Sequence, residues 1–274
     1  MKSRRATSSV GSPSSSSSPS SRGLKIKLSL LGLLLYLLFL TLQLPLAWLI
    51  KFVPANYPMQ FHQASGHPWQ GNIERITWKI ENEHIELGSL AWQWLPSELL
   101  NGRLGIQFKL TRVAQQLNGY FLLSRKGYNL KSVQGELDAA LLGFASRPLS
   151  LLQPKGSITI DIPDLHLSPK RIHGEATIHW LNARSGLVAA PMGDYRANLS
   201  SAPDGRRALI NIQTLQGALN IAGNIDYSFT QGLDGRLLLT PPSDERSKVY
   251  LPALSLLGRP NASGAWTLLL SAPR

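Results

Sequence analysis

Hydrophobic and polar residues alternate along most of the chain beyond residue 50. Apolar side chains occupy every second position in residues 104–110, 158–162 and 176–180. Alternation buries one face of a strand and leaves the other in water, which is typical of antiparallel sheets. Turn-forming pairs such as Asn118-Gly119 and Asp204-Gly205 separate the runs. The pattern predicts roughly a dozen strands at a spacing of about 8–12 residues.

Helical signals are few in the same region. Residues 96–102 begin with proline and end with glycine, as a short helix does, and residues 139–152 are a second candidate. Glycine recurs near strand starts, among them Gly135 and Gly174, where it marks either a bend in the strand or simply a turn. The sequence therefore predicts a mainly β fold, a curled or elongated antiparallel sheet with one or two short helices.

Tryptophan is concentrated between residues 66 and 102. Trp78 alternates in step with Ile76, and Trp92 and Trp94 share a face with Leu90. This spacing places the rings on the apolar side of the sheet. We therefore interpret them as core residues at a corner of the sheet, with an aromatic binding platform as the alternative.

The first 50 residues follow a different pattern. Residues 28–50 carry no charge, and a helix of this length can cover the roughly 30 Å hydrocarbon core of a bilayer. A secretory signal peptide has a shorter apolar run and a small-x-small cleavage site, whereas Pro45-Leu46-Ala47 is a poor site. Residues 28–50 are predicted to be an uncleaved transmembrane signal anchor, with a cleaved signal as the alternative.

Basic residues flank this run unequally. Six precede it without an acidic residue, and only Lys51 follows it closely. Since positive residues are retained in the cytoplasm, the N-terminus is predicted to be cytoplasmic and the β domain to lie outside. Residues 1–27 are basic and serine-rich, and such a tail lacks the apolar content to fold. The predicted organisation is a disordered tail (1–27), an anchor (28–50) and an outer β domain (51–274).

Composition narrows the function classes. The chain has a net charge of +12 and no cysteine. The basic residues of the β domain are dispersed, whereas nucleic-acid readers cluster them, so no nucleic-acid partner is expected. Without cysteine, the domain has no disulfide framework, thiol catalysis or cysteine metal site.

No catalytic constellation emerges from the residues. Neither the HExxH pair of metalloproteases, nor a GxSxG elbow, nor a phosphate-binding P-loop is present. His173 and His179 share a strand face, but Glu175 is the one carboxylate near them, and solvated strand-face histidines are the better interpretation. We expect no catalytic, cofactor-binding or metal-binding residues and no cofactor.

Several motifs recur in a specific order behind the basic tail and the apolar run. They are GHPWQG (66–71), LGSLAWQW (87–94), LPSELLNG (95–102), PKGSITIDIPDL (154–165), IHGEATIHWLNA (172–183) and LQGALNIAGNIDY (215–227). In this order they resemble the type II secretion system protein N family, also called general secretion pathway protein N, of Gram-negative bacteria. The likeness extends from about Lys25 to the end and leaves the serine tract outside.

The resemblance implies a non-enzymatic accessory component of the inner membrane, with a periplasmic β domain. Its implied partners are other type II secretion components, bound through protein–protein contacts that serve export across the outer membrane. A more distant likeness to AsmA-like proteins implies the alternative, a lipid-handling module with an apolar groove; a hydrolase of envelope material is a third class. We expect a closed or nearly closed trough, lined by Ile160, Ile178, Ile221, Ile225 and Leu237.

Overall fold

The structure is a computed structural model that describes residues 21–54, 57–80, 83–113, 115–144, 153–255 and 257–271. It divides into two compact units, Met1–Leu44 and Pro45–Arg274. The first contains helix α1 (Ser21–Leu42), on which leucine side chains are exposed. The second contains the sheet. The serine tract up to residue 20 lies outside the described residues.

The run predicted as one anchor, residues 28–50, is divided between the two units. Helix α1 ends at Leu42, and Pro45 adopts an extended conformation as the N-cap of a separate helix, α2 (Leu46–Ile50). Leu46 is buried against the sheet. Among the described residues, none of the helices has the length and apolar character needed to cross a membrane.

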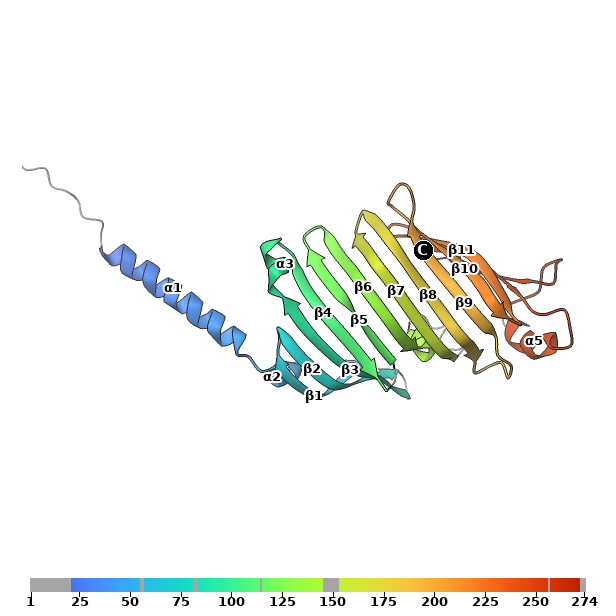
Figure 1. Ribbon diagram of the computed structural model, residues 1–274, viewed down its shortest axis with the longest axis horizontal. Coiled ribbons are helices and arrows are strands. Elements are labelled where there is room, and N and C mark those ends of the chain that lie inside the picture. Colours follow the sequence, from blue (N-terminus) through green and yellow to red (C-terminus); the bar gives the residue numbers. More distant parts are fainter. Residues whose placement is uncertain are drawn as a thin grey trace, which may run out of the picture. The chain divides into compact units, whose positions relative to one another are not determined.

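Thirteen strands form one antiparallel sheet in which every strand pairs with its neighbours in the sequence (Figure 1). The strands are β1 (Met59–His67), β2 (Gln70–Ile80), β3 (Glu83–Leu95), β4 (Leu104–Arg112), β5 (Gln115–Ser124), β6 (Gly127–Asp138), β7 (Pro154–Ser168), β8 (Arg171–Ser185), β9 (Gly193–Ser201), β10 (Ala208–Gly217), β11 (Asn220–Ser228), β12 (Gly232–Thr240) and β13 (Trp266–Ser271). The predicted antiparallel β fold is confirmed. Because the order is strictly sequential, β1 and β13 are the two edges.

The predicted helix at residues 96–102 is confirmed as α3 (Pro96–Leu100). Residues 139–152 begin with the 3-10 helix η1 (Ala139–Phe144), and their remainder lies outside the described residues. Helix α5 (Ser247–Ser255) was not predicted, since it contains Pro252 and has only a short apolar stripe. It lies between β12 and β13 in the chain.

Three separate clusters of buried side chains stabilise the sheet. One lies under β1–β3 and includes Leu46 from α2, and one spans β6–β11 around Ile172. The third joins α5 to β8, β9 and β13. The sheet is a single layer, so each cluster depends on curvature or on a short helix to cover its apolar side.

The tryptophans occupy the corner at β2 and β3. Trp92 packs against the cluster of Ile73 and Ile76, and its indole Nε1 donates a 2.9 Å hydrogen bond to the carbonyl oxygen of Pro68. Trp94 makes an edge-to-face ring contact with Trp69. Trp92 thus packs against the core although it is itself only partly buried, and Trp78, also partly buried, shares the face of Ile76.

Two glycines show how the sheet bends in its centre. Gly135 in β6 and Gly174 in β8 have φ angles of +155° and +130°, beside register shifts in the neighbouring strand pairs. A Cβ atom at Gly174 would collide with the backbone carbonyl oxygen of Asp164. Only glycine fits this close approach, so these positions are bends within strands.

Candidate functional site

The two faces of the sheet differ sharply in chemistry. One row of register partners crosses the sheet from β3 to β13 on the first face: Leu90, Leu110, Leu117, Gly135, Ile160, Ile178, Ala197, Ile212, Gly223, Leu237 and Leu268. The adjacent row on the second face is Ala91, Lys109, Asn118, Gln134, Asp161, Thr177, Asn198, Asn211, Asn224, Arg236 and Leu269. We call them the apolar face and the polar face.

The apolar face is covered unevenly. Ile225 is 7% exposed, but Ile178 is 38% exposed. The residues predicted to line a trough do share this face, as the register of Ile160 with Ile178 shows. The expectation of a closed trough is wrong at Ile178, because a single layer offers the centre of the face too little cover.

The polar face carries many uncharged side chains that form hydrogen bonds across strands. The Gln134 Nε2 atom donates to Asp161 Oδ1 at 3.1 Å, and Asn211 Nδ2 donates to Asn224 Oδ1 at 2.8 Å. Thr177 Oγ1 donates to Asn198 Oδ1 at 3.3 Å. These bonds join neighbouring strands and so stabilise the sheet.

The histidines lie on this polar face. His173 and His166 are register partners in β8 and β7. His179 accepts a 3.1 Å hydrogen bond from Arg196 Nε. Across the described ranges, no group of three His, Asp or Glu side chains is arranged to hold a metal ion. The arrangement matches strand-face histidines with neighbouring polar partners.

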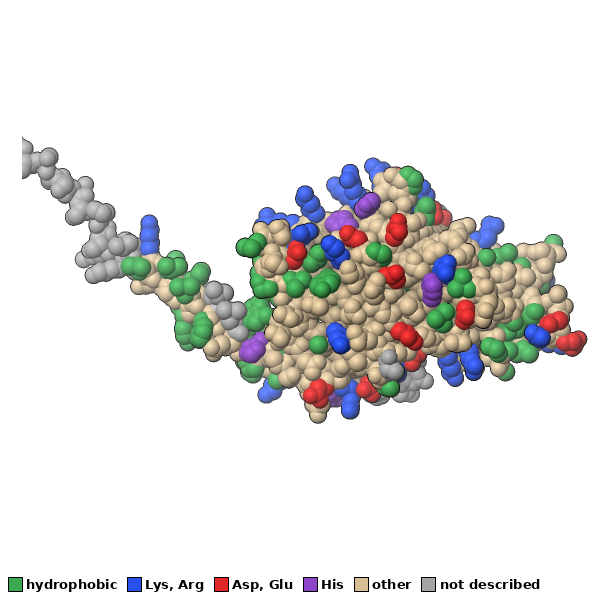
Figure 2. All heavy atoms as spheres, viewed as in Figure 1, with side chains coloured by type: hydrophobic (Ala, Val, Ile, Leu, Met, Phe, Trp, Pro, Cys, Tyr) green, Lys and Arg blue, Asp and Glu red, His purple; other side chains and the backbone are tan. Residues whose placement is uncertain are grey.

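Basic residues gather at one end of the strands, a feature that the dispersed sequence positions concealed. Arg103 follows α3, and Arg125 and Lys126 form the β5–β6 turn. With His166 they line a cavity of about 410 Å³, in which the buried Asn129 Oδ1 has no hydrogen-bond partner. Figure 2 shows Lys and Arg side chains along the upper margin of the sheet unit. In an antiparallel meander, every second turn lies at the same end of the strands. Basic residues in alternate turns were therefore the sequence signal that could have identified this basic end.

In another basic turn at the same end of the strands, the charge of an arginine is balanced by nearby carboxylates. Arg207 lies 2.9 Å from Asp226 and 3.6 Å from Asp204. The pKa of Asp204 lies below its usual value, first because the backbone N–H of Arg206 donates to its carboxylate and then because of the neighbouring arginines.

A second cavity, of about 550 Å³, lies between β1, β2, β3 and β4 and is lined mainly by uncharged residues such as Gln93, Gln107 and Trp92.

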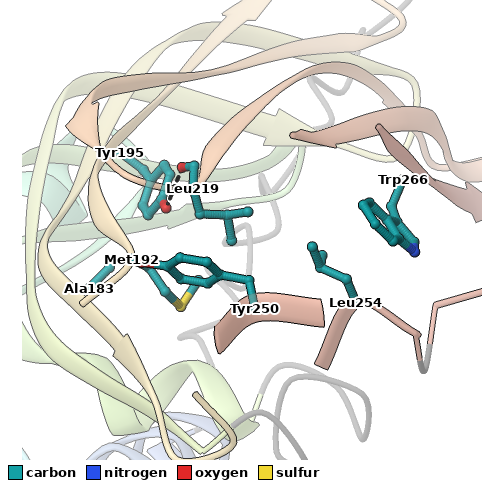
Figure 3. Close-up of a cluster of buried hydrophobic side chains, with 7 residues drawn as sticks. All are labelled: Ala183, Met192, Tyr195, Leu219, Tyr250, Leu254 and Trp266. Atoms are coloured by element: carbon teal, nitrogen blue, oxygen red, sulfur yellow. Dashed lines mark hydrogen bonds between the residues drawn. The ribbon is translucent and has the colours of Figure 1, made fainter. Parts of the chain in front are cut away.

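The C-terminal cluster holds the last strand against α5 (Figure 3). Tyr195 donates a hydrogen bond to the Leu219 carbonyl oxygen at 2.9 Å, and Trp266 Nε1 donates to the Gly258 carbonyl oxygen at 3.1 Å. Burial raises the pKa of Tyr195 and of Tyr250 above the ordinary tyrosine value. Both phenols are satisfied core groups, so the cluster is structural.

The edge formed by β1 is interrupted and covered. Gln63 has a φ angle of +53° and is left out of the pairing with β2, although the register is the same on both sides of it, so the backbone of β1 is irregular at this residue. Met59 and Phe61 of β1 pack with Leu46 and Ile50 of α2. A covering helix is one way in which proteins prevent an edge from pairing with another strand.

The edge formed by β13 has neither feature. Its pairing with β12 runs without a register shift from Leu239 opposite Trp266 to Asp234 opposite Ser271. The strand carries no charge and no proline, and Leu269 on the polar face is 67% exposed. Among the described residues, no backbone hydrogen bond other than the ladder with β12 reaches residues 267–271.

Comparison with known proteins identifies one family. The family model described as type II secretion system (T2SS), protein N, matches residues 57–268, from just before β1 into β13. No curated protein and no solved structure shows significant similarity to the chain.

Proposed function

The chain belongs to the type II secretion system protein N family, and we propose that it is a non-enzymatic accessory component that acts through contacts with other components of that system. The observation that carries the proposal is the family match over residues 57–268, which takes in the whole sheet except the end of β13. The cross-strand hydrogen bonds of the polar face also favour a scaffold over a catalyst.

The test is secretion by a strain that lacks the chain. We expect a substrate of the type II pathway to accumulate in the periplasm and to return to the medium when the full chain is supplied. A periplasmic marker protein controls for leakage. Unchanged secretion in the deletion strain would remove the proposal.

We also propose that the part of the apolar run 28–50 that precedes α2 anchors the chain in the inner membrane, with the N-terminus in the cytoplasm and the sheet in the periplasm. The uncharged run and the six basic residues before it support this orientation. A reporter enzyme that is active only in the periplasm, fused after Arg274, should be active. Activity only of a cytoplasmic reporter would reverse the orientation.

The second candidate is a lipid-handling module. The observation that favours it is the partial exposure of the apolar face at Ile178, because exposed apolar surface costs about 25 cal/mol for each Å² left in water. Phospholipid that co-purifies with the full chain, and is lost from a folded Ile178→Asp variant, would favour this candidate. Mass spectrometry of the purified protein separates the two functions.

A further inference from the structure

The last strand of the sheet has the side-chain pattern of an interior strand. We propose that the outer edge of β13 pairs with an extended, uncharged segment of another type II secretion component, which becomes a fourteenth strand of the sheet. The inference rests on the proposed function and specifies how the partner binds. Main-chain pairing at an open sheet edge is a known mode of recognition, in which side chains on the two faces of the added strand provide specificity.

Strand β13 is apolar on both faces of the sheet. Leu268 and Leu270 continue the apolar face, as register partners of Leu237 and Gly235. On the polar face, Leu269 is 67% exposed and Leu238 of β12 is 37% exposed. The polar side chains of the central strands therefore give way to leucine at this edge. Strands that are apolar on both faces are typically covered on both sides and paired on both edges.

The backbone of β13 is regular along its whole length. Strand β13 pairs without a bulge over its six residues. Among the described residues, no backbone hydrogen bond reaches residues 267–271 apart from the ladder with β12. In an antiparallel pair, alternate N–H and C=O groups point away from the partner strand. These groups form a regular, unobstructed row that a further strand can use.

The position of α2 at the opposite edge of the sheet favours a different protein over a second copy as the partner. The chain enters the sheet unit at α2, which packs on β1, at the edge opposite β13 in the 13-stranded sheet. Two copies joined through β13 would place their α2 helices at opposite ends of a double sheet, about 120 Å apart if it were flat. Two copies anchored in one membrane through the segment before α2 would therefore need their anchors at this fixed, large separation. A partner that supplies only one segment has no such constraint.

The test is site-specific photocrosslinking of the full chain in intact, secreting cells. Benzoylphenylalanine replaces Leu269 in one strain and Gln60, an exposed residue of β1, in the control strain. We expect the residue 269 probe alone to form an adduct, and peptide mapping to place it in an extended, uncharged segment of a type II secretion component. An adduct with a second copy, with lipid only or with a helical segment would overturn the proposal. So would the absence of an adduct, or an equal adduct from residue 60.

A charge substitution tests the same edge by function. With the benzoylphenylalanine moved to residue 267, Leu269→Lys should reduce the crosslink from that position and the amount of secreted substrate by at least about tenfold, because a lysine on an edge opposes strand addition. Leu269→Val should keep both, since a β-branched residue suits a strand. Gln60→Lys is the matched control on β1. The melting temperature of each variant, measured on purified full chain, should stay at the parental value because both positions are exposed.

The outcomes separate this inference from the proposed function. If deletion of the chain stops secretion but Leu269→Lys secretes like the parent, the proposed function stands and pairing at β13 is wrong. If deletion has no effect on secretion, the proposed function fails, and only a mapped adduct at residue 269 would still support strand pairing.

Discussion

The two edges of the sheet are treated in opposite ways. Strand β1 has an irregular backbone at Gln63 and packs against α2, while β13 is regular, uncharged and leucine-rich on both faces. The polar side of β1 carries residues such as Gln60 and His62, as expected of a strand that borders water. One edge is closed by the chain itself, and the other is left for pairing.

The difference shows where a sheet of this kind can grow. A long antiparallel meander always has two edges, and an unprotected edge risks aggregation. Protection at β1 coincides with the entry of the chain through α2. Lack of protection at β13 therefore points to a partner at the far side of the sheet. The stability of the two edges can be compared experimentally.

The largest expected effect concerns the support of β13. Trp266→Ala removes a buried indole from the cluster around Tyr250 and Leu254, and truncating a buried tryptophan lowers the free energy of unfolding by about 3–5 kcal/mol. Denaturant unfolding of the purified protein measures the loss. Leu269→Ala, on the same strand but exposed, should change it by no more than about 0.5 kcal/mol. Equal effects of the two substitutions would show that the cluster does not hold the edge.

The second effect concerns the cover of β1. Leu46→Ala empties the contact between α2 and the side chains of Ile73 and Ile76, and should lower the free energy of unfolding by about 2–3 kcal/mol, the low end for a buried leucine. Amide hydrogen exchange should accelerate in β1 and stay unchanged in β13. Uniform acceleration would mean that the two edges are not independent.

The alternation of apolar residues was sufficient to predict the antiparallel sheet, because burial of one face imposes a period of two. The confirmed α3 carries its own proline and glycine signals. Helix α5 escaped prediction because Tyr250 and Leu254 are buried by tertiary contacts in the cluster that they share with Trp266, and Pro252 is unfavourable for a helix.

The surfaces were less predictable than the fold. Arg103 and Arg125 are far apart in the sequence and meet because alternate turns of the meander share one end. Whether the outer edge of β13 is paired could not be predicted from the sequence, because the alternation of apolar residues describes the two faces of a strand and not its edges. The exposure of Ile178 likewise depends on how far a single layer curls.

The third effect is a loss of stability at alkaline pH that originates in the cluster beneath β13. Burial raises the pKa of Tyr195 and Tyr250 above the ordinary value of 10.0. Each phenol then keeps its proton longer in the folded chain than in the unfolded chain. Their contribution to stability is complete below about pH 10 and is lost as the pH rises through the folded pKa.

Thermal melts between pH 8 and pH 12 measure this dependence. We expect the melting temperature of the parent to fall above about pH 10. Tyr195→Phe should weaken the dependence, because phenylalanine has no proton to release, although the hydrogen bond to the Leu219 carbonyl oxygen is lost. A parental pH profile in Tyr195→Phe would place the alkaline transition elsewhere in the molecule.

The smallest effect concerns the irregular backbone of β1 at Gln63. Gln63 has a φ angle of +53°, in the left-handed region where a side chain costs about 1 kcal/mol and glycine does not. Gln63→Gly should therefore raise the free energy of unfolding by about 0.5 kcal/mol, after the greater freedom of glycine in the unfolded chain is subtracted. Gln60→Gly, in the regular part of the same strand, should lower it by about 0.5–1 kcal/mol. The opposite signs make the pair a sensitive measure in denaturant unfolding. If both variants lose stability equally, the backbone at Gln63 is not strained, and β1 is protected by α2 alone.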